Sequence, residues 1–173
     1  RVVTSSEYRL HSIGATVQAG VVLHAAARAR EVLASYRKCV ATAPDELMTI
    51  VVLTTAPAAP FLPASVHGQP VVIIGVCYAG SLDEGEHAIA GLRRIGPPLA
   101  DTIRPAPYVG HQALLDPGVP HGLGYYWKSE YVAALSDPLI ATLAEHAWRQ
   151  ATPQSYTIIF PLVGALARED AQG

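Results

Sequence analysis

The chain has 173 residues, of which half are hydrophobic and 15% are charged, and its formal net charge is −2. This composition supports one domain with a buried core and excludes a disordered chain. No cluster of Lys or Arg exceeds a pair and no apolar run reaches membrane-spanning length, so we expect neither nucleic-acid binding nor membrane association.

In the first half of the chain, the pattern predicts strands and one helix. Strands are expected over residues 1–11, about 15–24, 47–55 and 71–79, and a helix over 25–42. The segment between the last two strands is rich in Pro, which excludes helix and strand and predicts a loop. The two strands that flank it are expected to pair as an antiparallel hairpin.

In the second half, two helices have clear start signals. Ser81 with Glu84 three residues later forms a capping box for a helix that runs to about residue 95. Ser136 caps a helix with Pro138 in its first turn, and Pro153 closes it. Residues 99–124 are rich in Pro and Gly, with a short helix expected near 108–115. Strands are expected over 125–132 and 156–163, and a frayed tail over 165–173.

These elements predict an α+β fold, a mostly antiparallel sheet with about three helices packed on one face. No further helix is predicted for the other face. That face is either open to a ligand or partner, or covered by the irregular segment 99–124.

Cysteine and histidine usage suggests neither a disulfide framework nor a metal site. Cys39 and Cys77, the two cysteines, are expected to be buried unpaired thiols, and the seven histidines are scattered. We therefore expect no metal and, by default, a reducing cytoplasm. The first residue is Arg, which is consistent with a piece of a longer chain or with processing.

The predicted strand 125–132 contains the densest run of aromatic residues. Side chains alternate along a strand, so Tyr126, Lys128 and Glu130 would share one face. Such a face is exposed to water or lines a site. In the first case, Lys128 would pair with Glu130 or Glu145, and Tyr126 would be an ordinary half-buried aromatic.

Several segments, in this order, resemble the FAD-linked oxidases of the berberine-bridge-enzyme type, within the vanillyl-alcohol-oxidase (PCMH-type) superfamily. Residues 2–11 resemble the end of the flavin domain in these enzymes, and residues 43–47, 77–80 and 96–101 resemble the substrate domain of bacterial members. Residues 126–131 resemble a strand that faces the flavin region. The resemblance covers nearly the whole chain. It implies that residues 1–11 are a remnant of a flavin-domain strand and that residues 12–164 form a substrate-domain-like unit.

The resemblance also implies roles for individual residues. Lys128 and Tyr126 would be the catalytic pair, because a cation there stabilises an anionic reduced flavin or orients a substrate oxygen. Glu130, Tyr108 and His111 would contact the substrate, although a lone loop His is more often a surface residue. The backbone of Val2, Val3 and Thr4 would touch FAD if a flavin domain were present, and is otherwise a plain edge strand.

The chain departs from the family pattern in its cofactor half. It lacks the glycine-rich pyrophosphate loop, the covalent flavin attachment residues and the C-terminal Y-x-N pattern, and neither Cys39 nor Cys77 matches an attachment position. We therefore expect FAD binding only together with a flavin domain from missing sequence or a second polypeptide.

The predicted function is a substrate-binding domain, or a truncated relative, of a flavin-dependent oxidoreductase. The family reaction is hydride transfer from an alcohol or amine carbon of a small-molecule substrate to FAD, which dioxygen reoxidises. One alternative is a non-enzymatic α+β module that binds a small apolar ligand or forms a homodimer through its open sheet face. Another is a gene remnant that folds poorly.

Overall fold

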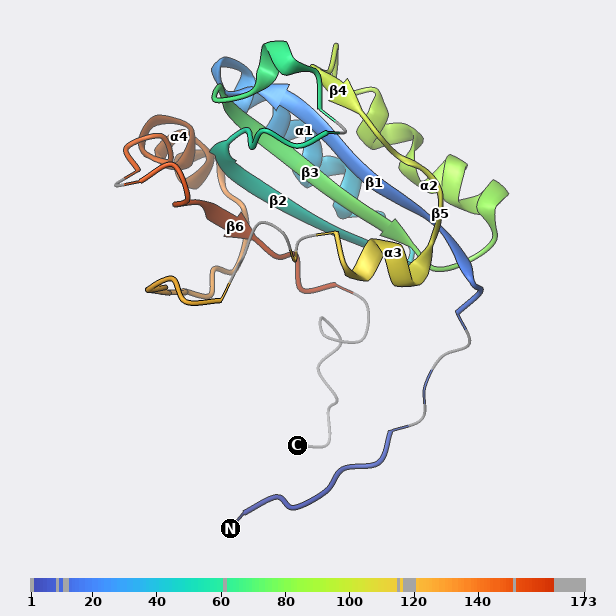
Figure 1. Cartoon of the computed structure of the whole chain (residues 1–173). Coiled ribbons are helices and arrows are strands. Elements are labelled where there is room, and N and C mark those ends of the chain that lie inside the picture. Colours follow the sequence, from blue (N-terminus) through green and yellow to red (C-terminus); the bar gives the residue numbers. More distant parts are fainter. Residues whose placement is uncertain are drawn as a thin grey trace.

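The computed structural model of the chain describes residues 2–8, 10, 13–60, 62–114, 116, 121–150 and 152–163. The predicted tail 165–173 lies outside this range, as do Arg1 and His11 at the ends of the first predicted strand. In Figure 1 the strands form one sheet, with α1 and α2 behind it.

Three long strands form the centre of the sheet. β1 (Thr16–Ala25), β2 (Leu47–Thr55) and β3 (Pro70–Tyr78) are rich in β-branched residues, which suit a pleated, buried surface. β3 lies in the middle and pairs antiparallel with both neighbours, Leu47 opposite Tyr78 on one side and Gln18 opposite Tyr78 on the other. The predicted hairpin is confirmed. Its connecting loop contains one short 3-10 turn, η2 (Ala64–Val66).

Short strands complete the six-stranded sheet at both edges. β4 (Ala100–Asp101) and β5 (Arg104–Pro107) pair with β1, and β6 (Thr157–Ile159) pairs with β2, giving the order β4-β1-β3-β2-β6. All pairings are antiparallel. β4 and β5 were not predicted, because Pro105 and Pro107 argue against a strand. Proline is tolerated here because β5 lies at an edge, where a missing N–H costs no ladder bond.

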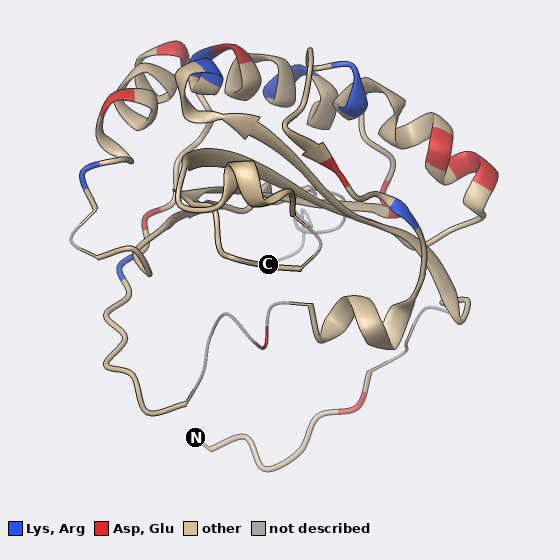
Figure 2. Ribbon diagram, turned by 45° about the horizontal axis from the view of Figure 1, so that its top comes forward, with Lys and Arg blue, Asp and Glu red and all other residues tan. Residues whose placement is uncertain are grey.

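Three helices cover one face of the sheet, as predicted. They are α1 (Ala29–Val40), which follows the 3-10 turn η1 (Ala26–Arg28), α2 (Leu82–Arg93) and α4 (Asp137–His146). Figure 2 shows these helices as an upper layer above the sheet. A fourth, short helix, α3 (Tyr108–Gln112), lies on the other side of the sheet. The α+β class is confirmed.

The connections follow a split-βαβ arrangement. The chain leaves β1, passes through α1 and enters β2, with β3 between the two strands; likewise β3, α2 and β4 enclose β1. The first four strands therefore have the order 4-1-3-2 of ferredoxin-like folds. This topology puts α1 and α2 on the same side and leaves the opposite side without a long helix.

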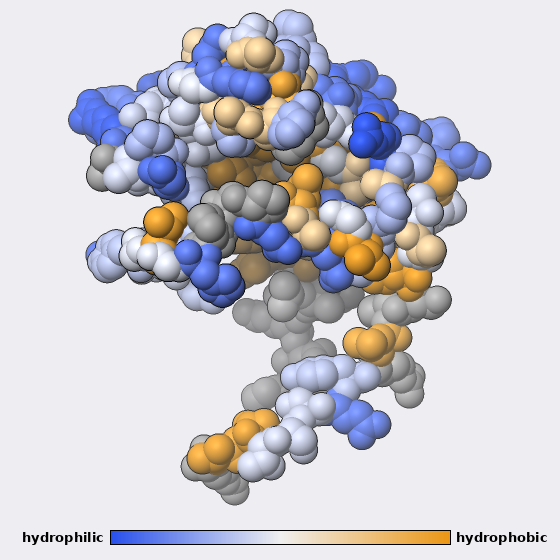
Figure 3. All heavy atoms as spheres, in the orientation of Figure 1, coloured by the Kyte–Doolittle hydropathy of each residue, from blue (hydrophilic) through white to orange (hydrophobic). Residues whose placement is uncertain are grey.

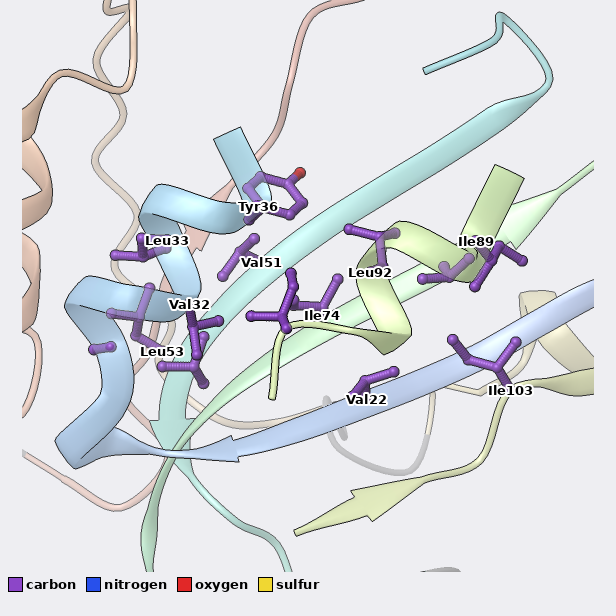
Figure 4. Close-up of a cluster of buried hydrophobic side chains, with 14 of the residues drawn as sticks. Val22, Val32, Leu33, Tyr36, Val51, Leu53, Ile74, Ile89, Leu92 and Ile103 are labelled. Carbon is purple, nitrogen blue, oxygen red and sulfur yellow. The ribbon is translucent and has the colours of Figure 1, made fainter. Parts of the chain in front are cut away.

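The main core lies between the sheet and the helices. Val22, Val51 and Ile74 point to the helical side from three different strands, and each is completely buried. They meet apolar residues of α1 and α2, which Figure 4 shows around them: Val32, Leu33, Tyr36, Ile89 and Leu92. Burying one such side chain contributes roughly 1.5–3 kcal/mol, so this layer supplies most of the driving force for folding.

The predicted helix starts are confirmed at both serines. Ser81 Oγ accepts the Glu84 N–H at 3.3 Å and donates its own proton to the Glu84 carboxylate at 2.6 Å. Ser136 Oγ accepts the Leu139 N–H at 3.4 Å. Each serine thus satisfies one of the backbone donors that a helix start leaves open.

Two predicted strands are wrong within the described residues. Residues 2–8 and 10 have no regular structure, and the side chains of Val2 and Val3 are 87% and 81% exposed. Residues 125–132 also have no regular structure and are exposed throughout. Both segments have strand-like sequences, but a strand needs a partner ladder, and neither has one in the described part of the chain.

The final predicted strand is shorter than expected. The pattern indicated residues 156–163, whereas β6 spans Thr157–Ile159, where it pairs with Val51, Val52 and Leu53.

Among the described residues, no helix combines the length and the apolar character that crossing a bilayer requires.

Candidate functional site

The face of the sheet that the helices leave uncovered is the main candidate site. We call it the second sheet face. It consists of the side chains that alternate with the core residues: Val17, Ala19, Val21 and Leu23 of β1, Met48, Ile50, Val52 and Thr54 of β2, Val71, Ile73, Gly75 and Cys77 of β3, and Ile158 of β6. Except for Thr54, the face contains apolar residues, one thiol and one glycine.

The second sheet face is covered at both ends of β1. The β2–β3 loop packs Ala56 and Leu62 against Leu23 and Val71, and at the start of β1 the side chains of Val17 and Ala19 are only 1% and 2% exposed. Farther along, Val21, Ile73 and Cys77 are half-buried, and Met48 is 61% exposed. Figure 3 shows hydrophobic atoms at the bottom of a hollow in this face, and Figure 2 shows the Lys, Arg, Asp and Glu residues gathered mainly on the helical layer.

Helix α3 carries two predicted site residues beside this face. Tyr108 and His111 are half-buried, whereas Val109 and Gly110 between them are exposed. Residues three apart share one side of a helix, so both side chains lie on the side of α3 that faces the protein. The Tyr108 N–H donates to the Ala15 carbonyl at 3.0 Å, which fixes the start of α3 at the beginning of β1.

The chemistry of these two side chains follows from their surroundings. Burial lowers the pKa of His111, so its imidazole is neutral near pH 7 and can accept a proton. The Tyr108 hydroxyl accepts a hydrogen bond from the Gln112 amide at 3.0 Å. The hydroxyl proton is therefore free to be donated to another group.

The predicted catalytic pair does not lie on a strand. Tyr126 is 89% exposed, and Lys128 and Glu130 are exposed as well, so the alternation that would have placed them on one sheet face does not exist. In the described part of the chain no ion pair joins Lys128 to Glu130 or to Glu145, which instead lies 3.6 Å from Arg149. The catalytic roles of Lys128 and Tyr126 and the substrate contact of Glu130 stay predictions.

Trp127 of this segment forms a ring contact at the edge of the sheet. The rings of Trp127 and Tyr156 lie 5.3 Å apart in an edge-to-face arrangement, an interaction worth about 0.5–1.5 kcal/mol. Tyr156 directly precedes β6. The segment 125–132 therefore lies at the β6 edge of the sheet, and its other aromatic side chains remain exposed, with Tyr131 at 91%.

The predicted cofactor contacts are isolated from the sheet. Val2, Val3 and Thr4 are exposed and have no regular structure. They approach no other candidate residue by any hydrogen bond within the described part of the chain. Their role toward FAD stays a prediction that depends on a flavin domain.

Sequence reasoning missed the residues that make up the second sheet face. Cys77 was treated only as a buried thiol, although it lies half-buried on this face, where burial raises its pKa. Met48 and Ile73 were not singled out. The signal was present, because β1 and β3 are apolar on both faces, and a strand in a two-layer fold needs only one apolar face.

The second sheet face fits one part of a flavin nucleotide and not the other. A flat apolar surface suits the isoalloxazine ring. The pyrophosphate needs positive groups or uncapped helix starts, but α2 begins with Asp83 and Glu84 and α4 with Asp137. The first turn of α1 carries Glu31. The starts of α1, α2 and α4 therefore disfavour phosphate.

The described residues also contain no group of three or more His, Cys, Asp or Glu side chains arranged to hold a metal ion. The fold and the open face together define the class: an α+β unit with an antiparallel sheet, helices on one face, and an apolar second face available to a ligand or another domain.

Comparison with known proteins then points to flavin-linked oxidases. The chain is 29% identical over 109 residues to an FAD-linked oxidoreductase of Dictyostelium discoideum, a match that covers 62% of this chain and 24% of that protein. The chain thus matches about a quarter of the length of this curated relative. No protein-family profile matches the sequence.

A solved structure shares the fold. The structure of 6-hydroxy-D-nicotine oxidase from Arthrobacter nicotinovorans matches with a TM-score of 0.50 and 20% sequence identity, over 64% of this chain and 23% of that one. The sequence match therefore relates this chain to part of an FAD-linked oxidoreductase, and the structural match shows a shared fold. The berberine-bridge type within that group stays a prediction.

Proposed function

We propose that this chain is the substrate-binding part of a flavin-dependent oxidoreductase of the berberine-bridge type. Its second sheet face would form one wall of the site that contains the isoalloxazine ring and the substrate. The observation that carries the proposal is a broad apolar sheet face, half-exposed, in a chain whose relative is an FAD-linked oxidoreductase.

Other sequence would supply the flavin-binding half. The acidic helix starts of the chain disfavour phosphate, and the Dictyostelium relative is about four times longer than the matched region. In this arrangement the unpaired residues 2–8 would find their strand neighbours in that flavin domain. FAD held there would supply the hydride acceptor for an alcohol or amine substrate, with dioxygen as the final oxidant.

The residues of this chain would bind and orient the substrate. Ile50, Val52 and Ile73 exclude water from one side of the site, which strengthens every polar interaction within it. His111, neutral near pH 7, would take the hydroxyl or amine proton of the substrate. The Tyr108 hydroxyl would donate a hydrogen bond to the same substrate atom.

Lys128 and Tyr126 keep the catalytic roles predicted for them, and Glu130 keeps its role as a substrate contact. Their segment is exposed in the isolated chain, and its Trp127 ring lies against Tyr156, which directly precedes β6. Docking of a flavin domain along the β6 edge would bring Lys128 close to the flavin. The exposed aromatic residues Tyr126 and Tyr131 would become buried in that contact.

Nuclear magnetic resonance can test the role of the second sheet face. The ¹⁵N-labelled chain is titrated with FMN, which carries the isoalloxazine ring and a single phosphate, and the chemical shifts of the protein amides report the contact. We expect the largest shifts for the amides of Val21, Ile73 and Cys77. Shifts confined to the helical layer, or no shifts at millimolar FMN, would contradict the proposal.

Two variants sharpen the titration. Ile73→Lys places a charge on the second sheet face and should abolish the FMN shifts. Leu82→Lys places the same charge on the exposed first turn of α2, in the helical layer on the other side of the sheet, and should leave them unchanged. After gel filtration, neither the variants nor the parent chain should retain a flavin band near ~450 nm, because phosphate contacts are missing.

The half-exposed apolar face also favours a second candidate function, a binding module that forms a homodimer through this face. Sedimentation velocity separates the two candidates. A dimer that Ile73→Lys dissociates, in a chain whose amides do not respond to FMN, would favour the module.

A further inference from the structure

A pocket lies away from the second sheet face. It has a volume of about 570 Å³, and it forms where β2 begins and β3 ends, next to the first turns of α2. Small-molecule sites commonly have volumes of roughly 300–1,000 Å³, so a small ligand fits here. Tyr78, which lines the pocket, belongs to the helical side of the sheet and not to the second sheet face.

Tyr78 is the most deeply buried polar residue that lines the pocket, with only 5% of its surface exposed. Two glycines make room for its ring. A Cβ at Gly80 would lie 2.6 Å from Tyr78 Cε1, and a Cβ at Gly85 would lie 2.9 Å from Cδ1. Among the described residues, no side-chain hydrogen bond involves the Tyr78 hydroxyl, and it does not count among the buried polar atoms that lack a partner, so a ligand in the pocket can form a hydrogen bond with it.

The other polar groups of the pocket are also hydrogen-bond acceptors. Glu46 and Glu84 each bring a carboxylate, and Glu84 uses one of its oxygens to accept the Ser81 hydroxyl. The His87 Nδ1–H donates to the Asp83 carbonyl at 2.7 Å, because a carbonyl only accepts. In the neutral imidazole, Nε2 is then left as an acceptor.

The electrostatics favour a cation. No Lys or Arg is among the residues that line the pocket. Burial raises the pKa of Tyr78, and the negative charges of Glu84 and Glu46, which line the same pocket, raise it further. A ligand with positive charge and several N–H donors matches this set of acceptors.

The walls distinguish an organic cation from a metal ion. In the described residues no three His, Cys, Asp or Glu side chains come close enough together to hold a metal. The pocket also has apolar walls, formed by Pro44, Ala79 and Ala88. These walls suit an alkyl chain. A bare metal ion, which needs oxygen ligands, would gain nothing from apolar contacts.

We propose that this pocket binds a small alkylammonium ligand. The ammonium group donates to the Tyr78 hydroxyl oxygen and to the carboxylates of Glu46 and Glu84, and the alkyl chain contacts Ala79 and Ala88. The site involves no flavin and no residue of the second sheet face, so the test of this proposal is independent of the test of the proposed function.

The test is a titration of the ¹⁵N-labelled chain with n-butylammonium chloride, with n-butanol as the neutral analogue. We expect saturable shifts of the amides of Ala79, Gly80 and Gly85 with the ammonium only. Tyr78→Phe keeps the ring in place and should weaken binding about tenfold, because it removes a hydrogen bond to a charged group. Glu46→Gln should weaken binding about threefold, since its carboxylate is exposed to solvent.

Glu145→Gln is the matched control, because it removes the same charge from α4, far from the pocket in sequence and element. It should bind n-butylammonium as the parent chain does. Three results would overturn the proposal: shifts that increase linearly without saturation, equal shifts with butanol, or saturation that Tyr78→Phe leaves unchanged. Stronger saturable shifts with calcium chloride would also overturn it in favour of a metal site.

Discussion

Among the described residues, Tyr36 has the largest side chain that the core buries almost completely, with 1% of its surface exposed. Its hydroxyl and the Thr49 hydroxyl lie 2.8 Å apart and satisfy each other inside the core. An unpaired buried hydroxyl would cost about 1–3 kcal/mol. Because α1 carries Tyr36 and β2 carries Thr49, this one hydrogen bond fixes the helix against the strand.

Tyr36 predicts an alkaline limit to stability. Burial, partly offset by the hydrogen bond between Tyr36 and Thr49, raises its pKa from 10.0 to about 12. The unfolded chain therefore loses this proton first, and stability falls as the pH rises from about 10 to about 12, by about 2–3 kcal/mol in total. Urea unfolding between pH 8 and pH 12 measures the slope.

Tyr36→Phe is the control for that slope. The variant should be less stable at pH 8 by about 1 kcal/mol, because Thr49 loses its partner, and should lose part of the decline above pH 10. An identical decline in both proteins would show that other groups cause it.

Gly20 gives a second test at the residue scale. Its φ is 151°, and a Cβ there would lie 2.6 Å from the Thr102 carbonyl oxygen, part of the backbone that joins β4 to β5. Gly20→Ala should therefore destabilise the protein by roughly 2 kcal/mol or more and loosen the β4–β5 edge. Gly110→Ala, where no atom lies within 4 Å of the added carbon, should change the thermal midpoint little.

At the scale of elements, the helix starts depend on residues close by in the sequence, whereas the edges of the sheet depend on contacts between residues of different elements. Ser81 and Ser136 each cap their helix through a backbone N–H three residues later. The β4 edge depends on distant contacts: Arg93 of α2 pairs with Glu86 at 2.7 Å and with Asp101 of β4 at 3.0 Å. This arginine also donates to the Ile103 carbonyl.

The caps predict two separate losses of stability. Ser136→Ala and Ser81→Ala should each lower the free energy of unfolding by about 1 kcal/mol, because each leaves a helix N–H without its acceptor. Ser65→Ala, in the short turn η2, should have almost no effect, since helix capping does not involve it. Thermal melts of the three variants give the comparison; equal losses in all three would exclude a capping effect.

At the scale of the whole molecule, the two faces of the sheet have opposite environments. Ile74 lies in the core and is completely buried, whereas its neighbour Ile73 lies half-buried on the second sheet face. One residue along the strand thus separates the interior of the protein from a surface that the proposal assigns to the flavin and the substrate.

These neighbours predict opposite outcomes for the same substitution. Ile74→Lys buries a charge in the core and should prevent cooperative folding. Ile73→Lys should fold with a thermal midpoint near that of the parent chain, because its side chain can reach water. Circular dichroism melts distinguish the two. If Ile73→Lys also fails to fold, the second sheet face is buried, as it would be in an obligate dimer.

The sequence by itself determined the elements that depend on neighbours along the chain. The capping serines, the helical periodicity of α1, α2 and α4, and the β-branched runs of β1, β2 and β3 were all readable. So was the antiparallel hairpin, because two apolar strands that follow one another in the sequence, joined by a Pro-rich loop, usually pair with each other. The α+β class followed from these elements and their order.

The tertiary structure decided the rest, because a strand exists only where a partner is available. Residues 125–132 have a strand pattern but no partner strand among the described residues, whereas residues 104–107 contain two prolines and pair with β1. For the same reason only the structure added the second sheet face as a candidate site, with Tyr108 and His111 beside it, while the roles of Lys128 and Tyr126 stay predictions. Hydrogen-bond partners distant in sequence leave no local pattern, so only the folded chain reveals them.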